Sequence, residues 1–427
     1  MKKIILTTLI LGQMIMAATL EHIDVNGLKV PVIFESDKRL PLVTMQFVFT
    51  NAGSIKDTKK AGLAKMSARV MNEGTSKLGS SAFAEALEAK AIGISSSVGS
   101  ETFVMEVGSL KEEFDEALGY FDMLLKDPNF TEKALQKVKT TTIGSLTANE
   151  NDFDYVASNQ LKAILFDGTP LANPSSGTID SVKNIQLNDV KKFIKTNLVA
   201  SKLIVLLGGD IDLKSAKIKI AKIIKSMDKG KNTKVKHYNV TKTPKEVVLK
   251  KQTQQAYLYF GSPYDMRDGD KDYYKARVAT FILGTGGFGS RLMEEIRVKR
   301  GLAYSAYARI HISKSCNYFN GYLQTKIDSL DEAKKTVKDV IAKFVKDGVT
   351  QDELEQTKKF LLGSEPLRVE SMSQRLNRSF MEYYKGHKLG YSLNELKKIN
   401  TLKLKELNEF IKKHYEINQL SFSIVTK

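Results

Sequence analysis

The sequence predicts an α+β fold of two tandem homologous domains, each a mainly antiparallel sheet with helices packed on one face. Three observations predict it: a length of 427 residues, an internal duplication, and a polar, lysine-rich segment near the middle of the chain. This length exceeds one ordinary hydrophobic core and indicates two to four domains. The hydrophobic and charged fractions, 42% and 27%, are those of a globular protein and exclude a disordered chain.

The first eighteen residues, 1–18, predict a signal peptide. Lys2 and Lys3 precede an uncharged, largely apolar run over residues 4–16, and the small pair Ala17-Ala18 follows. A positive start, an apolar run too short to span a bilayer and small residues at its end are features of an export signal. The alternative is a buried N-terminal helix. No later segment is apolar for long enough to cross a membrane, so we expect a soluble periplasmic protein without a membrane span.

The first predicted domain, residues 19–227, opens with strands. Large apolar side chains at positions 43, 45, 47 and 49 recur with the period of a half-buried strand. Helices are expected from about Gly62 and from Ser81, followed by a strand-rich stretch over 94–110. The next helix is predicted by apolar residues at helical spacing and is ended by Pro128; they are Phe114, Ala117, Leu118, Phe121 and Leu125.

The second predicted domain, residues 246–427, repeats this order. Residues 115–146 align with 331–365: both segments begin Asp-Glu-Ala, and a Thr, a Leu, a Lys and a Gly-Ser pair recur in the same order after three inserted residues. Farther along, 190–195 pair with 407–412, and a terminal strand follows each. An ordered series at a nearly constant offset indicates duplication. Residues 228–245 between the halves are polar and poor in large apolar side chains, a linker composition.

The net charge of +18 does not predict a nucleic-acid partner. The lysines are spread over helix faces and are not gathered with interleaved aromatic residues, so a solvated surface is the better interpretation. Export also argues against DNA or RNA, whereas an acidic protein partner or substrate stays open. The single cysteine, Cys316, cannot form an internal disulfide and is expected to be a small buried side chain.

Residues 51–75 read NAGSIKDTKKAGLAKMSARVMNEGT. This segment resembles the N-terminal active-site helix of the pitrilysin/insulinase-like zinc metallopeptidases, of the short two-domain, processing-peptidase-like type. The family pattern is glycine-serine, glycine-leucine-alanine, an inverted zinc motif and glycine-threonine. Gly53-Ser54, Gly62-Leu63-Ala64 and Gly74-Thr75 match that pattern. The zinc motif between them does not.

The missing motif consists of two histidines that share one helix face and bind zinc, with a glutamate that accepts a proton from zinc-bound water. The resemblance places these three positions at Lys65, Ala68 and Arg69. The family's third ligand is a glutamate on a later helix, roughly within residues 140–149, which read TTTIGSLTAN and hold no carboxylate. The resemblance therefore implies a degenerate member that binds no metal or other cofactor itself.

The histidines do not suggest a replacement site. They lie far apart in the sequence and none belongs to a spaced ligand pair; the five are His22, His237, His311, His387 and His414. We expect surface histidines.

Residues 283–310 read LGTGGFGSRLMEEIRVKRGLAYSAYARI and resemble the second-domain substrate-binding signature of the same family. There a glycine-rich turn leads to Ser-Arg-Leu, a helix with an arginine and, seven residues later, a tyrosine. The matching positions here are Gly284, Gly286, Gly287, Gly289, Ser290, Arg291, Leu292, Arg297, Gly301, Leu302 and Tyr304. The resemblance implies substrate binding for Gly286, Gly287, Gly289 and Arg291.

The family implies that Arg297 and Tyr304 reach substrate held at the zinc of an opposite domain. A guanidinium and a phenol can donate hydrogen bonds to substrate carbonyls and to the developing oxyanion. The structural alternative is an exposed helix arginine that pairs with Glu294 or Glu295, and a core tyrosine.

The same glycines satisfy the dinucleotide-binding pattern G-x-G-x-x-G between Gly284 and Gly289. That pattern requires a strand before it. The preceding residues, 273–284, are more typical of a helix, and no acidic residue follows in a βαβ unit. We therefore reject nucleotide binding.

The resemblance implies the non-zinc subunit of an exported heteromeric metallopeptidase. Such a chain binds peptide or unfolded protein and supplies Arg297 and Tyr304 in trans to a zinc-bearing paralogous subunit, so zinc is expected in the partner. The alternative is a catalytically inactive scaffold with the same fold. A self-sufficient zinc peptidase is contradicted by Lys65, Ala68 and Arg69.

Overall fold

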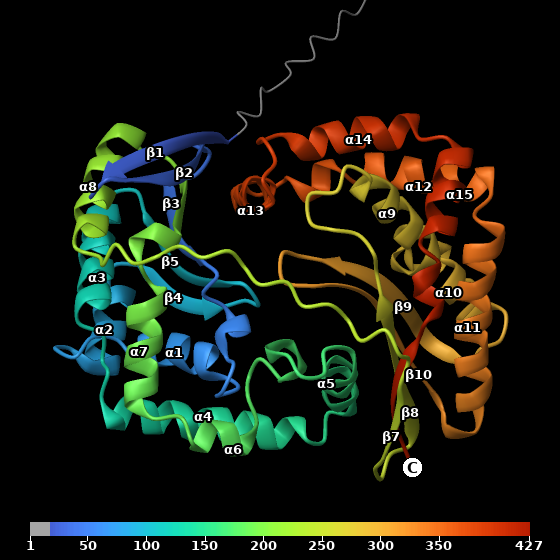
Figure 1. Ribbon diagram of the computed structural model, residues 1–427. Helices are drawn as coiled ribbons and strands as arrows, with labels where there is room; N and C mark the ends of the chain where they lie inside the picture. The colour runs from blue at the N-terminus through green and yellow to red at the C-terminus, as the bar shows by residue number, and fades with distance from the viewer. Residues whose placement is uncertain (1–17) are drawn as a thin grey trace, which may run out of the picture.

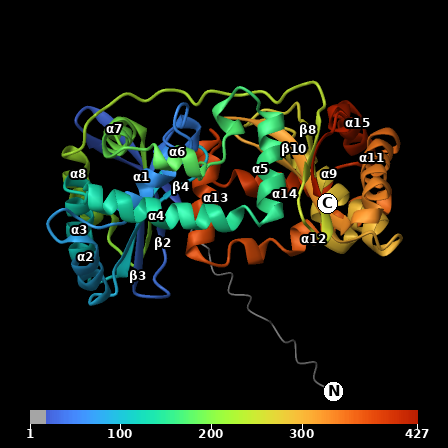
Figure 2. The same ribbon diagram turned by 90° about the horizontal axis from the view of Figure 1, so that it is seen from below.

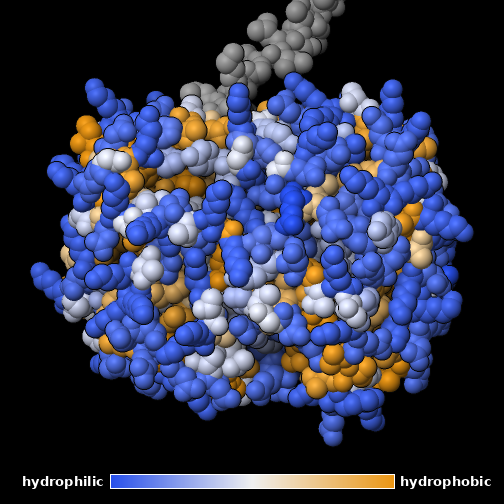
Figure 3. Space-filling view, in the orientation of Figure 1, coloured by the Kyte–Doolittle hydropathy of each residue, from blue (hydrophilic) through white to orange (hydrophobic). Residues whose placement is uncertain are grey.

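A computed structural model describes residues 18–427 and divides them between two sheets, each with its own set of helices (Figure 1). The predicted signal peptide, apart from Ala18, lies outside the described residues. Within residues 18–427, no helix combines the length and the apolar character needed to cross a bilayer. The face in Figure 3 is mostly hydrophilic, with scattered apolar patches.

The first sheet has six strands in the order β1-β2-β6-β3-β5-β4. Their bounds are Thr19–Val25 (β1), Leu28–Ser36 (β2), Leu42–Thr50 (β3), Gly93–Val98 (β4), Thr102–Leu110 (β5) and Leu203–Gly209 (β6). Neighbouring strands are antiparallel except β2 and β6, which are parallel. The alternation predicted around β3 is confirmed, because Val43, Met45, Phe47 and Phe49 are all buried.

The second sheet has the order β7-β11-β8-β10-β9. Its strands are Glu246–Lys250 (β7), Gln255–Pro263 (β8), Ala303–Ile312 (β9), Asn317–Lys326 (β10) and Ser421–Thr426 (β11). Again one pair, β7 and β11, is parallel and the others are antiparallel. Apart from β1, the two sheets have the same strand order and directions, so the duplication predicted from sequence is confirmed.

Helices of the first domain pack on one face of the first sheet. The core there joins residues of β3, such as Phe47, to residues of α1, α2, α3 and α8, and the Phe47 and Phe121 rings meet edge to face at 4.9 Å. Helix bounds are Leu63–Met71 (α1), Gly79–Glu88 (α2), Phe114–Lys126 (α3), Glu132–Asn149 (α4), Phe153–Leu165 (α5), Ile179–Lys183 (α6), Leu187–Asn197 (α7) and Leu213–Lys225 (α8). Short 3₁₀ turns cover Ser54–Lys56, Pro170–Ala172 and Ala200–Lys202.

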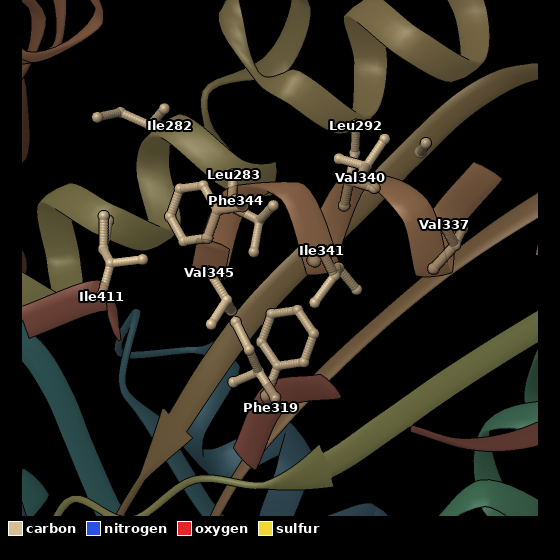
Figure 4. Packing of buried hydrophobic residues seen from close by; sticks show 14 of the residues in the cluster. Ile282, Leu283, Leu292, Phe319, Val337, Val340, Ile341, Phe344, Val345 and Ile411 are labelled. Carbon is tan, nitrogen blue, oxygen red and sulfur yellow. The ribbon is translucent and has the colours of Figure 1, made fainter. Parts of the chain in front are cut away.

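The second domain has the equivalent arrangement. Figure 4 shows Ile341 and Phe344 among Leu283, Leu292 and Phe319, which belong to the larger apolar core. Helix bounds are Tyr273–Thr280 (α9), Arg291–Met293 (α10), Leu330–Asp347 (α11), Gln351–Gly363 (α12), Met372–Tyr384 (α13), Tyr391–Thr401 (α14) and Leu404–Lys413 (α15). Two π-helical turns cover Phe281–Thr285 and Glu294–Val298, and 3₁₀ turns cover Gly287–Gly289, Ile327–Ser329, Pro366–Arg368 and Tyr415–Asn418.

Helix capping repeats between the domains along with the topology. Thr131 is the N-cap of α4 and its side chain accepts the Ala134 N–H; Thr350 is the N-cap of α12 and accepts the Glu353 N–H. An N-cap hydroxyl satisfies a backbone donor that has no partner in the first turn. This local requirement explains why the aligned threonines recur in both halves.

The two domains exchange one helix each across their interface. α5 of the first domain packs on the second sheet, with Leu161 and Leu165 against Tyr259 and Val425. α13 of the second domain packs on the first sheet, with Leu376 and Phe380 in contact with strand residues that include Ile33 and Ile204. Both helices lie between the two halves in Figure 2. Each sheet therefore has helices of its own domain on one face, as predicted, and a helix of the other domain on the second face.

Residues 228–245 contain no helix or strand and connect α8 to β7. Residues of this segment nonetheless form hydrogen bonds with both domains. The Asn51 side chain donates to the Thr233 carbonyl at 2.8 Å, the Tyr238 N–H donates to the Ser315 carbonyl at 2.7 Å, and the Thr241 N–H donates to the Leu165 carbonyl at 2.8 Å. This segment is an ordered connection that lies along the interface.

Candidate functional site

The altered metal motif lies on α1, at the edge of the first sheet. Gly62 precedes the helix with a φ of +88°, and a Cβ there would come within 2.8 Å of the Ser176 carbonyl, so the position requires glycine. The buried Asp57 carboxylate accepts the N–H groups of Gly62 at 3.1 Å and of Ala64 at 2.9 Å. This carboxylate satisfies the first turn of α1, and sequence reasoning missed it.

The three motif positions make protein contacts of their own. The Lys65 ammonium donates to the Ser176 hydroxyl at 3.1 Å, and the Arg69 guanidinium donates to the Thr142 hydroxyl at 2.5 Å. Thr142 belongs to α4, the helix where the resemblance places the third zinc ligand. Ala68 is buried.

These residues do not fit a zinc ion. An ammonium and a guanidinium are donors without a lone pair for a metal, and alanine has no ligand atom. Within residues 18–427, no group of three or more His, Cys, Asp or Glu side chains is placed to hold a metal. The side chains at these three positions therefore cannot take the roles of zinc ligands and general base.

Burial changes the acid–base properties around α1. Desolvation, then the nearby Arg69 and Lys162 charges, lower the pKa of Lys65. Burial raises the pKa of Asp57 to about 7, against its two backbone hydrogen bonds and the Lys65 charge. This region therefore carries positive charge that Asp57 only partly balances near neutral pH.

The glycine-rich turn of the second domain is required by its backbone path. A Cβ on Gly284 would come within 2.6 Å of the Ala308 backbone, and one on Gly286 within 2.8 Å of the Phe281 carbonyl. Gly287 has a φ of +59°. A Cβ on Gly289 would meet no atom within 4 Å. Close packing and a left-handed conformation thus account for three of these glycines.

Arg291 forms an ion pair with Glu353 of its own domain. Its Nε and Nη2 atoms donate to the two Glu353 carboxylate oxygens at 2.7 and 2.8 Å, and its guanidinium lies 5.5 Å from the Phe344 ring centroid. A bidentate pair of this kind fixes both partners. The structure therefore explains Arg291 as a link between α10 and α12, without a substrate.

Arg297 lies between two exposed aromatic rings. Its guanidinium carbon is 4.2 Å from the Tyr304 centroid and 4.6 Å from the Phe288 centroid. Tyr304 is 82% exposed and Phe288 is 63% exposed. Gly301, with a φ of +62°, turns the chain into β9, so that Tyr304 returns over Arg297. Phe288 was missed because its only sequence signal is its place within the glycine turn.

The structural alternative for this pair is wrong. Glu295 pairs with Lys299 and Arg300, and a Glu294 oxygen lies 3.9 Å from the Lys299 ammonium, whereas no carboxylate in residues 18–427 pairs with Arg297. Tyr304 is not a core residue. The guanidinium donors and the phenol are available to a ligand.

The chain is similar to known proteins over its whole length. It is 43% identical over 428 residues to a Helicobacter pylori protein described as a non-peptidase homolog, YmxG, with 100% of this chain and 99% of that protein covered. Residues 32–179 match the family model described as insulinase (peptidase family M16). The chain belongs to the M16 peptidase family. Residues 184–361 match the model described as peptidase M16 inactive domain.

The chain is also similar to a second curated protein and to a solved structure of the M16 family. A Bacillus subtilis protein described as an uncharacterized zinc protease, also YmxG, is 24% identical over 356 residues, which cover 83% of this chain and 85% of that protein. The crystal structure of a peptidase M16 inactive domain from Pseudomonas fluorescens has the same fold, with a TM-score of 0.88, 23% identity, and coverage of 96% and 98% of the two chains. The family and fold class predicted from sequence are confirmed.

The two M16 motifs do not meet within this chain. The cavity beside Lys65 is lined on its second-domain side by His311, Cys316 and Tyr318, and not by Arg297 or Tyr304. The buried Cys316 was predicted correctly. The glycine turn follows the helix α9 and a π-helical turn, not a strand, which agrees with the rejection of a dinucleotide site.

The prediction of surface histidines is wrong for His414. This ring is 5% exposed, its Nδ1 lies 2.7 Å from a Glu416 carboxylate oxygen, and it stacks on Tyr264 at 4.7 Å between centroids. It completes a buried polar cluster at the end of α15. No spacing of residues in the sequence reveals a contact between α15 and the loop after β8.

Proposed function

We propose that this M16 homologue is no peptidase by itself and serves as the non-zinc subunit of an exported heteromeric metallopeptidase. In this role it binds peptide and presents Arg297 and Tyr304 to a zinc-bearing paralogous subunit in the periplasm. The observation that carries the proposal is the half-buried Arg297 guanidinium, which lies beside the exposed rings of Phe288 and Tyr304 and has no carboxylate partner among the described residues. This chain itself holds no zinc, and its partner does.

The aromatic rings prepare Arg297 for a ligand. Ring faces attract a cation and hold the planar guanidinium in one orientation, while its edge N–H groups stay free to donate. Peptide carbonyls, and the oxyanion formed during amide hydrolysis, are suitable acceptors. The Tyr304 hydroxyl adds a second donor. An arginine with only a solvent-exposed structural role would be expected to pair with a neighbouring glutamate, as Arg300 does with Glu295.

Action in trans is supported by the separation of the two motifs. The α1 region of this chain carries Lys65 and Arg69, which repel a metal, and its cavity does not include Tyr304. The Arg297 pair has no zinc to serve inside its own chain. A second chain with an intact zinc motif supplies what is missing.

The second candidate function is a non-catalytic scaffold. The description of the Helicobacter pylori relative as a non-peptidase homolog favours it. In that case the fold provides an interaction surface and the Arg297 cluster recognises a partner without chemistry.

Reconstitution distinguishes these functions. The chain is purified from its native compartment by mild affinity capture, and any zinc-bearing M16 paralogue is then expressed separately and recombined with it. The proposal expects chelator-sensitive peptide hydrolysis by the pair and none by this chain alone. If the partner hydrolyses peptides at the same rate without this chain, or if the native chain elutes only as a monomer, the subunit role is excluded.

A further inference from the structure

A cavity of about 250 Å³ lies between the two domains beside the altered metal motif. Lys65 of α1 and Lys162 of α5 line it together with Tyr318 of β10, and its apolar walls include Phe166 and Leu171. α5 is the helix that packs on the second sheet, so the exchange of helices carries Lys162 to this place. None of these residues belongs to the Arg297 cluster.

Two ammonium groups line the cavity, and neither forms an ion pair with a carboxylate of residues 18–427. The single side-chain hydrogen bond of Lys65 is to Ser176, and within residues 18–427 Lys162 makes no ion pair. The Lys162 side chain is exposed to solvent. The protein around its ammonium group nevertheless lowers its pKa by desolvation, and the nearby positive charge of Arg309 lowers the pKa further. Asp57 is the one acidic residue of the lining, and both of its oxygens already accept backbone N–H groups.

The neighbouring groups neutralise this charge only in part, through Asp57. Lys65 and Lys162 line the same cavity, and the Lys162 charge helps to lower the pKa of Lys65, after desolvation and the Arg69 charge. Two like charges that face one small space are unfavourable unless an anion joins them. A ligand carboxylate with one oxygen toward each ammonium would supply that partner and form two charge-assisted hydrogen bonds.

We propose that this cavity binds a carboxylate with an apolar body, of the kind that a C-terminal amino-acid residue presents, between Lys65 and Lys162. The volume is that of about eight liquid water molecules and lies just below the ~300–1,000 Å³ of drug-sized ligand sites, which suits one apolar residue. The rings of Phe166 and Tyr318 offer the body an apolar surface, whereas inorganic phosphate would leave that surface unused.

The ligand joins elements of both domains. Lys65 belongs to the first domain, and the facing wall, with His311, Cys316 and Tyr318, belongs to the second. Binding therefore holds the two domains together at the place where other M16 chains have their zinc motif. The lysine at position 65 is explained as part of an anion site, whereas Arg69 does not line the cavity and donates to Thr142.

Titration calorimetry on the full chain alone tests the proposal. The probes are N-acetylphenylalanine, its C-terminal amide, N-acetyl-Ala-Ala-Phe and inorganic phosphate. The acid is expected to bind at least about tenfold more tightly than the amide and than phosphate, because only the carboxylate with an apolar body uses both features of the cavity. If the tripeptide acid binds more tightly than the single residue, the source is a peptide end; if they bind equally, it is a free carboxylic acid.

Two variants locate the site. Lys162→Gln is expected to weaken binding of the acid by about tenfold or more, and since this side chain is accessible and unpaired, folding should be unaffected. Lys133→Gln removes the same charge from an exposed position on α4 and serves as the matched control. The NMR signal of ¹³C-methylated Lys162 should also shift on addition of the acid and not of the amide.

The proposal is overturned if the acid and the amide bind equally, if neither binds, if phosphate binds more tightly than the acid, or if Lys162→Gln binds as the parent does. No partner subunit or hydrolysis enters these measurements. The result is therefore independent of the proposed subunit role.

Discussion

The Arg297 guanidinium lies 4.2 Å from the centre of the Tyr304 ring, and the ring is 82% exposed. A large aromatic side chain this exposed gains little from burial, so its position is not explained by the core. The ring stacks on an arginine that pairs with no carboxylate of residues 18–427, which gives the second domain an accessible hydrogen-bonding surface. The first domain has the opposite character, because Lys65 and Arg69 occupy the positions of the zinc ligands.

The first prediction concerns metal. The purified chain should contain far less than one zinc per molecule after dialysis, and chelators should leave its melting temperature unchanged, because Lys65, Ala68 and Arg69 offer no ligand atoms. Elemental analysis and thermal unfolding with and without chelator measure this. Stoichiometric zinc that survives dialysis would contradict the account of α1.

The second prediction concerns the interface between the domains. Arg375 of α13 pairs with the buried Glu35 and with Asp37, at 2.8 Å from the latter. Arg375→Ala leaves Glu35 buried without its cation, which should lower the free energy of unfolding by about 3–5 kcal/mol. Urea unfolding of the full chain measures the change.

Arg39 provides the matched control for Arg375. It also pairs with Asp37, but its side chain is 63% exposed. Arg39→Ala should therefore cost less than about 1 kcal/mol. Equal effects of the two substitutions would show that α13 does not depend on this ion pair.

Features that depend on local sequence patterns can be predicted from this sequence, whereas features that depend on contacts between distant residues cannot. Local patterns predict the strands and the M16 family, because each depends on residues close together in the sequence, and the order of those patterns predicts the duplication. The exchange of α5 and α13 depends on contacts between residues more than a hundred positions apart, such as Arg375 with Glu35. Lys162 and Lys65, which line one cavity, are 97 positions apart, and the buried His414 stacks on Tyr264, 150 positions away. No periodicity or spacing in one chain reports such contacts.

The third prediction concerns pH and Asp57. Burial raises its pKa to about 7 in the folded chain, from about 3.8 in the unfolded chain. The folded state therefore binds more protons between these values, so the contribution of Asp57 to stability is complete below about pH 4 and is lost as the pH rises to about 7. Between about pH 4 and 7, the free energy of unfolding of the parent should fall by on the order of a few kcal/mol relative to that of Asp57→Asn. Unfolding of both proteins at each pH measures this difference. A difference that does not change from pH 4 to 7 would contradict the raised pKa.

The last prediction concerns Tyr304 and Arg297 in a reconstituted pair with a zinc-bearing paralogue. Tyr304→Phe removes one hydroxyl and keeps the ring over Arg297, so the fold should be unchanged while the turnover number falls by up to ~100–1,000-fold, the cost of one oxyanion donor. A role in ground-state binding alone would raise KM and leave turnover largely unchanged. Arg297→Lys keeps the charge but loses the planar group that lies between Phe288 and Tyr304, and it should also be harmful.

The matched controls are Tyr415→Phe, at another exposed tyrosine, and Arg300→Lys, three residues from Arg297; both variants should retain activity. If the Tyr304 and Arg297 variants also retain full activity in a verified complex, these residues have no catalytic role in trans, and the Arg297 cluster belongs to an interaction surface of a scaffold.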